Sequence, residues 1–258
     1  MSEIKFKIAV LIDGDNAEAS IIEQMLNEAS KFGRITIKRI YADWTNQHMN
    51  SWKNKLNQFA IRPMQKFSYT TGKNSTDSAL IIDAMDIMHA KLVEGICIVS
   101  SDSDYTGLAN RLREEGFFVM GMGKAHTPEA FVKSCENFIY TEVLTPPNEK
   151  RIPENKRNQP KPVNLKIVGK TELPVLTNKI TNKPIDITLI DNAFQIAIND
   201  LTGLAPAGEL AKAIRKIDSS FDSRNFGYNS FKKFLEALKP KYEIVVNDKG
   251  TMLVKKKE

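Results

Sequence analysis

A short apolar run near the start of the chain ends abruptly in polar residues. Residues 6–12 read FKIAVLI, and DGDN follows at positions 13–16. A continuous run rich in β-branched residues is typical of a strand that is buried on both faces of a sheet. Strands of this kind lie inside parallel sheets, so the run predicts an α/β fold with helices on both faces.

The rest of residues 1–144 alternates between strand-like and helix-like patterns. Apolar or β-branched runs predict further strands at 35–43, 61–67, 96–104, 117–123 and 137–143. Apolar residues at helical spacing predict helices at 17–33, 50–60, 75–95, 105–116 and 127–135. This alternation predicts a mainly parallel sheet between two layers of helices, a three-layer sandwich.

The composition changes after residue 144. Seven of the chain's 11 prolines lie in residues 145–184, together with 9 basic and 3 acidic residues, which predicts a basic, proline-rich linker. Order is expected to return at residue 185. Three amphipathic segments, at 185–201, 206–218 and 227–238, precede a hairpin pattern at 242–256. Three helices and a hairpin in this order predict a small winged-helix domain.

The formal net charge of +6 is unevenly distributed along the chain. Residues 1–144 hold 16 basic and 18 acidic residues, a net charge of −2, whereas residues 145–258 hold 21 and 13, a net charge of +8. A basic second half predicts a polyanionic partner such as a nucleic acid. The alternative is that these lysines only keep the chain soluble.

The cysteine and histidine content argues against disulfide and zinc sites. The chain has two cysteines with no C-x-x-C pair and three histidines without ligand spacing. Two free thiols indicate a reducing compartment. No apolar run approaches the ~18 residues that a membrane span needs. We therefore expect a cytoplasmic protein that does not enter a membrane.

Acidic residues follow two of the predicted strands. Asp13 comes directly after the first strand, and Asp102 and Asp104 end the fourth strand segment, at the sheet edge where open α/β folds bind ligands. Asp77 is expected in the first turn of a long helix, which returns it to the same edge. Asp83 lies six residues further on, rotated by about 240° around that helix, so we expect it either to support the site residues from behind or to have a structural role.

Carboxylates gathered in a cleft repel one another, and a divalent cation removes that repulsion. All-oxygen ligands favour Mg²⁺ or Mn²⁺ over zinc, and such a metal can activate water for attack on a phosphate. Asn16 is expected to hold a water or a phosphate oxygen, or to cap the next helix. Lys124, after the fifth strand, is a candidate phosphate contact. The alternative is that these motifs are ordinary turns and helix caps.

Three blocks of sequence carry a family resemblance: VLIDGDN, KNSTDSALIIDAM and IVSSDSDYTGLANRLREEG. Together they resemble the NYN branch of the PIN-like ribonucleases, the LabA-like group, over residues 6–142. The resemblance implies an α/β/α sandwich whose acidic cluster binds Mg²⁺ or Mn²⁺ and cleaves RNA phosphodiesters. It assigns metal-binding and catalytic roles to Asp13, Asp77, Asp102 and Asp104, and a conserved polar position to Asn16. Asp15 falls at a position that need not be acidic.

The segment SSFDSRNFGYNSFKKFLEAL resembles the LOTUS domain, also called OST-HTH, and the match covers about residues 185–257. The resemblance implies binding of single-stranded or G-rich structured RNA, or of a protein partner. We expect Arg224, Lys232 and Lys233 to surround Tyr228, which would combine phosphate contact with base stacking. The spacing of four apolar side chains instead fits core packing: Phe226, Phe231, Phe234 and Leu238.

The sequence therefore predicts a metal-dependent ribonuclease with a nuclease domain at 1–144, a linker at 145–184 and a LOTUS domain at 185–258. DNA as a substrate and the oligomeric state are left open. One alternative is a non-catalytic RNA-binding adaptor with the same fold. A second is a phosphatase of the haloacid dehalogenase type, because residues 13–15 echo its D-x-D motif. That family has Thr or Val at the fifth motif position, where this chain has Ala17.

Overall fold

The structure is a computed structural model that describes residues 6–66, 75–144, 185–239, 241–247 and 250–257. The predicted linker at 145–184 lies outside the described residues. In the described part of the chain, no helix has the length and apolarity that crossing a membrane requires.

Within the described residues up to 144, six strands form one parallel sheet in the order β3-β2-β1-β4-β5-β6. The strands are β1 (Lys7–Asp13), β2 (Arg34–Ala42), β3 (Arg62–Gln65), β4 (Gly95–Val99), β5 (Phe118–Gly123) and β6 (Asn137–Tyr140). The helices are α1 (Ile22–Ser30), α2 (Asn50–Phe59), α3 (Ser75–His89), α4 (Thr106–Glu114) and α5 (Glu129–Ser134). The predicted three-layer α/β/α architecture is confirmed.

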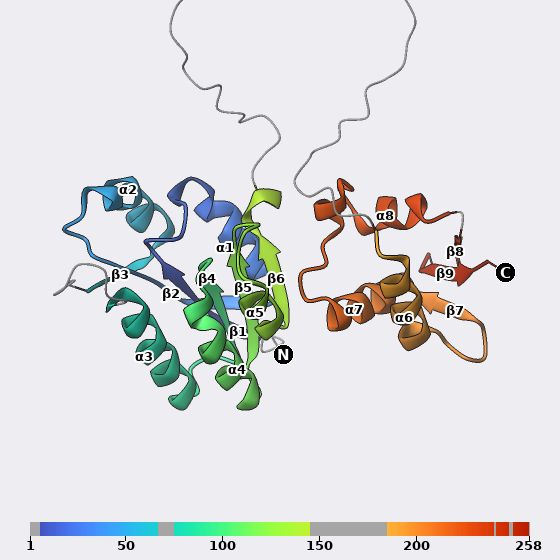
Figure 1. Ribbon diagram of the computed structural model, residues 1–258, viewed down its shortest axis with the longest axis horizontal. Coiled ribbons are helices and arrows are strands. Elements are labelled where there is room, and N and C mark those ends of the chain that lie inside the picture. The colour runs from blue at the N-terminus through green and yellow to red at the C-terminus, as the bar shows by residue number, and fades with distance from the viewer. Residues whose placement is uncertain (1–5, 67–74, 145–184, 240, 248–249, 258) are drawn as a thin grey trace, which may run out of the picture.

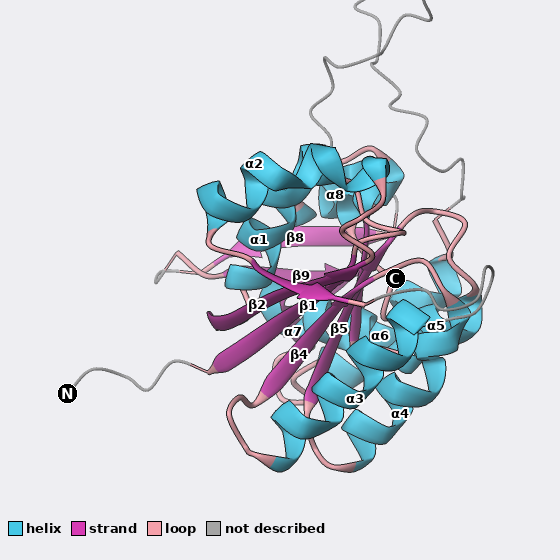
Figure 2. Ribbon diagram, turned by 90° about the vertical axis from the view of Figure 1, so that its left-hand side faces the viewer, coloured by secondary structure: helices cyan, strands magenta, loops and turns pink. Residues whose placement is uncertain are grey.

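The central strand β1 is buried on both faces, as its composition predicted. Ile8, Val10 and Ile12 pack into the cluster under α1 and α2, whereas Ala9 and Leu11 pack into the cluster under α3, α4 and α5. Figure 2 shows the two layers of helices on opposite sides of the strands. Burial of these side chains contributes roughly 25 cal/mol for each Å² of apolar surface removed from water. This packing anchors β1 in the middle of the sheet.

The strand order reverses between β1 and β4, the two central neighbours. Strands β2 and β3 lie on one side of β1, and strands β4, β5 and β6 lie on the other side. At such a reversal the loops after the two strands diverge and leave a crevice at the carboxyl edge. The predicted acidic motifs follow these two strands.

Gly14 makes the turn that leaves β1. A Cβ atom at this position would lie 2.9 Å from both the Cβ of Ala42 and the carbonyl oxygen of Tyr41. The backbone N–H of Gly14 also donates to that carbonyl at 2.9 Å. Only glycine allows the turn to approach β2 this closely, so the turn is fixed directly beside Asp13.

Some predicted elements end earlier than the sequence indicated. The last strand of the sheet stops at Tyr140 instead of residue 143, because Thr141–Val143 forms a 3-10 turn. The first helix of the C-terminal region stops at Ala197 instead of residue 201, and the chain then turns through a β-bridge between Asn199 and Leu204.

The described residues from 185 onward form the predicted winged helix. Helices α6 (Ile187–Ala197), α7 (Ala207–Ile217) and α8 (Phe231–Ala237) pack on an antiparallel sheet of β7 (Leu204–Pro206), β9 (Met252–Lys256) and β8 (Tyr242–Val246). Strand β7 was not predicted, because three residues carry no periodic pattern. Phe234 and Leu238 are buried, and Phe226 and Phe231 pack against the same core, as their spacing predicted.

The winged helix contacts the first domain along its outer strand β6 and helix α5 (Figure 1). The carbonyl of Ser219 accepts a hydrogen bond from the backbone N–H of Phe138 at 2.8 Å, and the Ser219 hydroxyl donates to the carbonyl of Val132 at 2.9 Å. Arg224 forms an ion pair with Glu28 of α1 at 2.7 Å. These three contacts hold the two domains side by side.

Candidate active site

Three of the four predicted aspartates meet at the carboxyl edge of the parallel sheet. Asp102 caps the 3-10 helix Ser103–Tyr105 that follows β4, Asp104 lies within that helix, and Asp77 lies in the first turn of α3. Each of the three offers a carboxylate oxygen, and these oxygens lie within 4.8 Å of one another. Carboxylates at this spacing can share one cation.

Asp13 is not one of these three residues and has no exposed surface. Its Oδ2 accepts hydrogen bonds from Nδ2 of Asn16 at 2.7 Å and from the hydroxyl of Ser100 at 2.8 Å. Its Oδ1 accepts from the backbone N–H of Asp15 at 3.1 Å. The amide of Asn16 therefore orients Asp13, and the substrate contact expected of Asn16 stays a prediction.

Burial and repulsion between carboxylates raise the pKa values of Asp13 and Asp77. Burial raises the pKa of Asp13, although the hydrogen bonds from Asn16 and Ser100 oppose that shift. Burial also raises the pKa of Asp77. The hydrogen bond to Asp77 opposes this effect, and the negative charges of Asp13, Asp102 and Asp104 raise the pKa of Asp77 further. A bound cation would stabilise the ionised carboxylates, as like-charge clusters require.

Two supporting residues were missed by the sequence reasoning. The hydroxyl of Tyr105 donates to Oδ1 of Asp77 at 2.7 Å, and the Tyr105 side chain is fully buried. The hydroxyl of Ser100 donates to Asp13 and accepts from the backbone N–H of Asp102 at 3.1 Å. Ser100 thereby links the ends of β1 and β4. The sequence offered one indication of their roles, since Ser100 and Tyr105 are the first and last residues of the acidic segment SSDSDY.

Asp83 lies outside the acidic group, as its rotation around the helix predicted. It forms an ion pair with Arg39 and accepts a hydrogen bond from the hydroxyl of Tyr41. Both partners come from β2, so Asp83 ties α3 to the sheet. Its role is structural.

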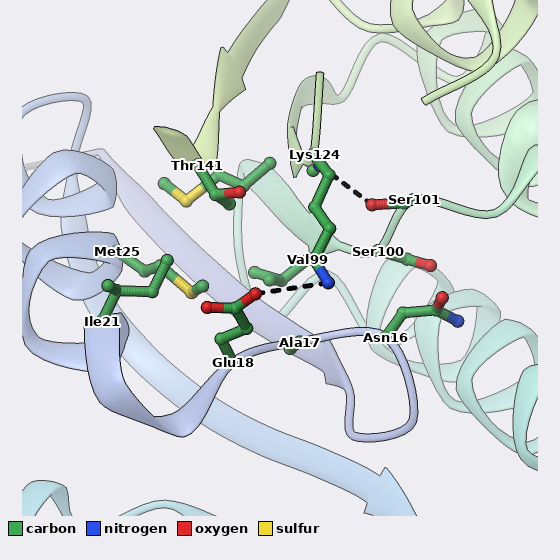
Figure 3. A pocket seen from close by; sticks show the side chains of 12 residues that line it. Asn16, Ala17, Glu18, Ile21, Met25, Val99, Ser100, Ser101, Lys124 and Thr141 are labelled. Carbon is green, nitrogen blue, oxygen red and sulfur yellow. Dashed lines mark hydrogen bonds and ion pairs between the residues drawn. The ribbon is translucent and has the colours of Figure 1, made fainter. Parts of the chain in front are cut away.

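A shallow pocket adjoins the acidic group at the carboxyl ends of β4 and β5 (Figure 3). Asn16 and Ser100 line it, and both also bond to Asp13, so the pocket and the acids share one edge. Nζ of Lys124 pairs with Glu18 at 3.2 Å across the pocket, and the backbone N–H of Lys124 donates to Ser101 at 2.9 Å. Lys124 therefore lies beside the acidic group with its charge partly neutralised by Glu18, and its contact with a phosphate stays a prediction.

The four candidate RNA contacts of the winged helix differ in exposure and in partners. Lys232 and Lys233 are exposed on α8. Tyr228 is half-buried, with its ring edge-on to Phe234 at 5.7 Å. Arg224 is bound to Asp222 and Glu28. Only the two lysines present an open cationic surface, and a role of Arg224 or Tyr228 in RNA binding stays a prediction.

The parallel sandwich with acids at its central edge defines a PIN-like α/β domain, here joined to a winged helix. The family model of the NYN domain matches residues 7–144, and that of the OST-HTH/LOTUS domain matches residues 188–254. The chain therefore belongs to the NYN domain family and carries a LOTUS domain, as both resemblances predicted.

Comparison with curated proteins found no match. Among solved structures, a protein of unknown function from Vibrio parahaemolyticus is similar over 54% of this chain and 94% of its own chain, with 21% identity and a TM-score of 0.45. The phosphatase alternative is not supported, because the family match is to NYN. In addition, Asp13 is wholly buried, which does not fit a nucleophile that attacks a phosphate.

Proposed function

We propose that this protein is a metal-dependent ribonuclease that hydrolyses RNA phosphodiester bonds. The observation that carries this proposal is the meeting of Asp77, Asp102 and Asp104 within 4.8 Å at the reversal point of an NYN sheet. The donors are all carboxylate oxygens, which fits Mg²⁺ or Mn²⁺. Such an ion, when bound, supplies charge neutralisation on the phosphate and activation of water.

The chain's own residues have distinct parts in this proposal. Asp77, Asp102 and Asp104 hold the cation directly. Asp13 completes the predicted set of catalytic and metal-binding aspartates, because its charge acts on Asp77 and Ser100 connects it to the loop of Asp102. The hydroxyl of Tyr105 fixes the orientation of Asp77.

We further propose that the LOTUS domain recruits RNA, single-stranded or G-rich and structured, to this site. Lys232 and Lys233 are exposed and suited to phosphate contact, and Lys124 can offer its ammonium group to a phosphate near the acids. Binding of a protein partner through the same domain is the alternative for recruitment. A cytoplasmic location stays a prediction that rests on the two free cysteines, which the structure buries.

The test is cleavage of a labelled single-stranded RNA in Mn²⁺, in Mg²⁺ and in EDTA, with the Asp102→Asn variant beside the native chain. Asp86→Asn is the matched control, because Asp86 is an exposed acid of α3 outside the acidic group. Loss of one ligand should remove several kcal/mol of transition-state stabilisation, so we expect cleavage to fall by about 10² or more. The control should cleave at the native rate.

Two results would contradict the proposal. Equal cleavage by the native chain and Asp102→Asn would place the activity elsewhere. RNA binding without cleavage in either metal would favour the non-catalytic adaptor.

A further inference from the structure

An open groove runs along the seam between the NYN and LOTUS domains. Its lining comes from α4, α5, β5 and β6 on one side and from α7 and the loop after it on the other. Its cavity volume is about 1090 Å³. Small-molecule pockets typically measure ~300–1,000 Å³, so the groove lies at the upper end of that range.

Cations from both domains line this groove. Lys212, Arg215 and Lys216 are spaced i, i+3 and i+4 on α7, so they share one face of that helix. Arg113 of α4 and Lys133 of α5 line the opposite side. Positive side chains on two facing walls repel one another until an anion lies between them.

Two of these cations are already neutralised by exposed ion pairs. Lys133 pairs with Glu129 at 2.6 Å, and Lys212 pairs with Glu209 at 2.8 Å. Exposed pairs of this kind contribute little and exchange readily. The remaining three cations therefore decide the character of the groove.

Among the described residues, Arg113, Arg215 and Lys216 form no ion pair, although the charge of Asp222 acts on Arg215. Arg113 donates to the carbonyl of Ser134 at 3.2 Å, which leaves its charge uncompensated. Arg215 is half-buried, and burial lowers the pKa of its guanidinium. A partly desolvated cation without an ion pair gains most from a phosphate, because the phosphate restores the lost interactions. Three acids, Glu129, Glu136 and Asp218, line the groove beside its five cations, so the lining carries a net charge of +2.

Aromatic rings form part of the same lining. The rings of Phe32 and Phe118 stack at 5.6 Å with an interplanar angle of 22°, and Tyr140 lines the groove near the other end of the sheet edge. All three side chains are half-buried. Cations that follow a backbone together with aromatic faces that accept bases are the combination found in grooves for single-stranded nucleic acid.

The domain contacts keep the two walls in place. Ser219 bonds to Val132 and to the backbone of Phe138, and Arg224 pairs with Glu28. We propose that this interdomain groove binds a single strand of RNA, with Arg113, Arg215 and Lys216 on its phosphates. This inference rests on the proposed function, which makes RNA the ligand. The groove is separate from the Lys232 and Lys233 surface of α8, which does not line it.

The test is equilibrium binding of a fluorescent single-stranded RNA to the full chain, measured by anisotropy over a range of salt concentrations. EDTA is present throughout, so cleavage does not affect the result. The first variant is Arg215→Gln with Lys216→Gln, and the second is Arg113→Gln on the NYN wall. The control is Lys53→Gln with Arg62→Gln, two exposed cations of α2 and β3 toward the opposite edge of the sheet.

Each lost phosphate contact should lower the slope of log affinity against log salt by about 0.7, so the double variant should lose about 1.4. At about 0.1 M salt this change corresponds to a loss of affinity of about 25-fold. In Arg113→Gln the slope of log affinity against log salt should fall by about 0.7. The control should bind RNA as the native chain does. Thermal unfolding of each variant, followed by circular dichroism, confirms that it is folded.

The variants also separate this inference from the ribonuclease proposal. If the folded variant Arg215→Gln/Lys216→Gln bound RNA as the native chain does, the groove proposal would be overturned. A loss of RNA affinity in that variant but not in Arg113→Gln would also overturn it, because the LOTUS domain would then bind the RNA without the NYN wall. Groove-dependent binding without any cleavage in Mn²⁺ would support the groove and refute only the catalytic proposal.

Discussion

The contact between Glu28 and Arg224 predicts how firmly the two domains are joined. Oε1 of Glu28 lies 2.7 Å from Nη1 of Arg224 and 2.6 Å from Nζ of Lys31. The exposed fractions of the Glu28 and Arg224 side chains are 9% and 28%, between the values of surface and buried pairs. The substitution Glu28→Gln removes the charge of this side chain and keeps its shape.

The magnitude follows from this partial burial. Exposed pairs contribute ~0.2–1 kcal/mol, and breaking a buried pair costs ~3–5 kcal/mol, mainly because a charge is left alone. Arg224 would not be left alone, since it keeps Asp222 at 2.7 Å. Glu28→Gln should therefore reduce the free energy that favours the docked state by about 1 kcal/mol, near the lower of the two ranges. This change lowers the ratio of docked to separated domains about fivefold.

The assay is the distribution of distances between spin labels on the two domains. Cys97 and Cys135 are buried, so labels should react with cysteines introduced at the exposed positions Arg62 and Lys255. Glu28→Gln should broaden the distribution toward longer distances. Glu23→Gln, at an exposed acid of the same helix, should leave it unchanged. An unaltered distribution for Glu28→Gln would refute the reasoning.

The same contact should weaken in acid. Burial alone would raise the pKa of Glu28 and of Asp222, but the hydrogen bonds and charge of Arg224 outweigh burial, so both pKa values are lowered. Glu28 pairs with Arg224 across the domains, so its lowered pKa stabilises the docked state fully above the ordinary value of 4.5, and that contribution is lost as the pH falls through the lowered value. Asp222 and Arg224 lie in the same domain, so their ion pair persists when the domains separate. Acidification below about pH 4 should therefore broaden the distances in the native chain, and less so in Glu28→Gln.

Two further substitutions test the acidic edge. Tyr105→Phe removes the hydrogen bond to Asp77, so the affinity for Mn²⁺ should fall by about 10–100-fold in a titration, and unchanged affinity would contradict the role of Tyr105. Gly14→Ala places a Cβ atom 2.9 Å from Ala42, and overpacking of this kind costs ~1–3 kcal/mol in a urea unfolding curve. Gly107→Ala in α4, where a Cβ would meet nothing within 4 Å, should instead be neutral or stabilising by up to about 1 kcal/mol. Equal destabilisation by the two alanines would contradict the close approach at Gly14.

The sequence predicted the elements of the sheet but not their order. The run at 6–12 shows a strand buried on both faces, because periodicity reports which side chains avoid water. It does not report which strands are neighbours. That β1 and β4 lie together became visible only in the structure, and this neighbourhood brings the two acidic motifs to one place.

The four aspartates were predicted from position and resemblance, but the burial of Asp13 was not. Its oxygens are taken by Asn16, Ser100 and the backbone of Asp15, and these partners depend on how the loops after β1 and β4 pack together. The partners of Arg224 also depend on how distant parts of the chain pack together. Its partner Glu28 lies 196 residues away in the sequence, so no local pattern could reveal that the domains meet there.

The most direct test of the acidic edge as a metal site is a titration of the protein with Mn²⁺, followed by electron paramagnetic resonance of the free ion. We expect a saturable Mn²⁺ site in the native chain and in Asp86→Asn, with Mn²⁺ binding strongly weakened in both Asp77→Asn and Asp102→Asn. Equal Mn²⁺ binding by all four proteins would show that the cation lies elsewhere, and would contradict the central claim.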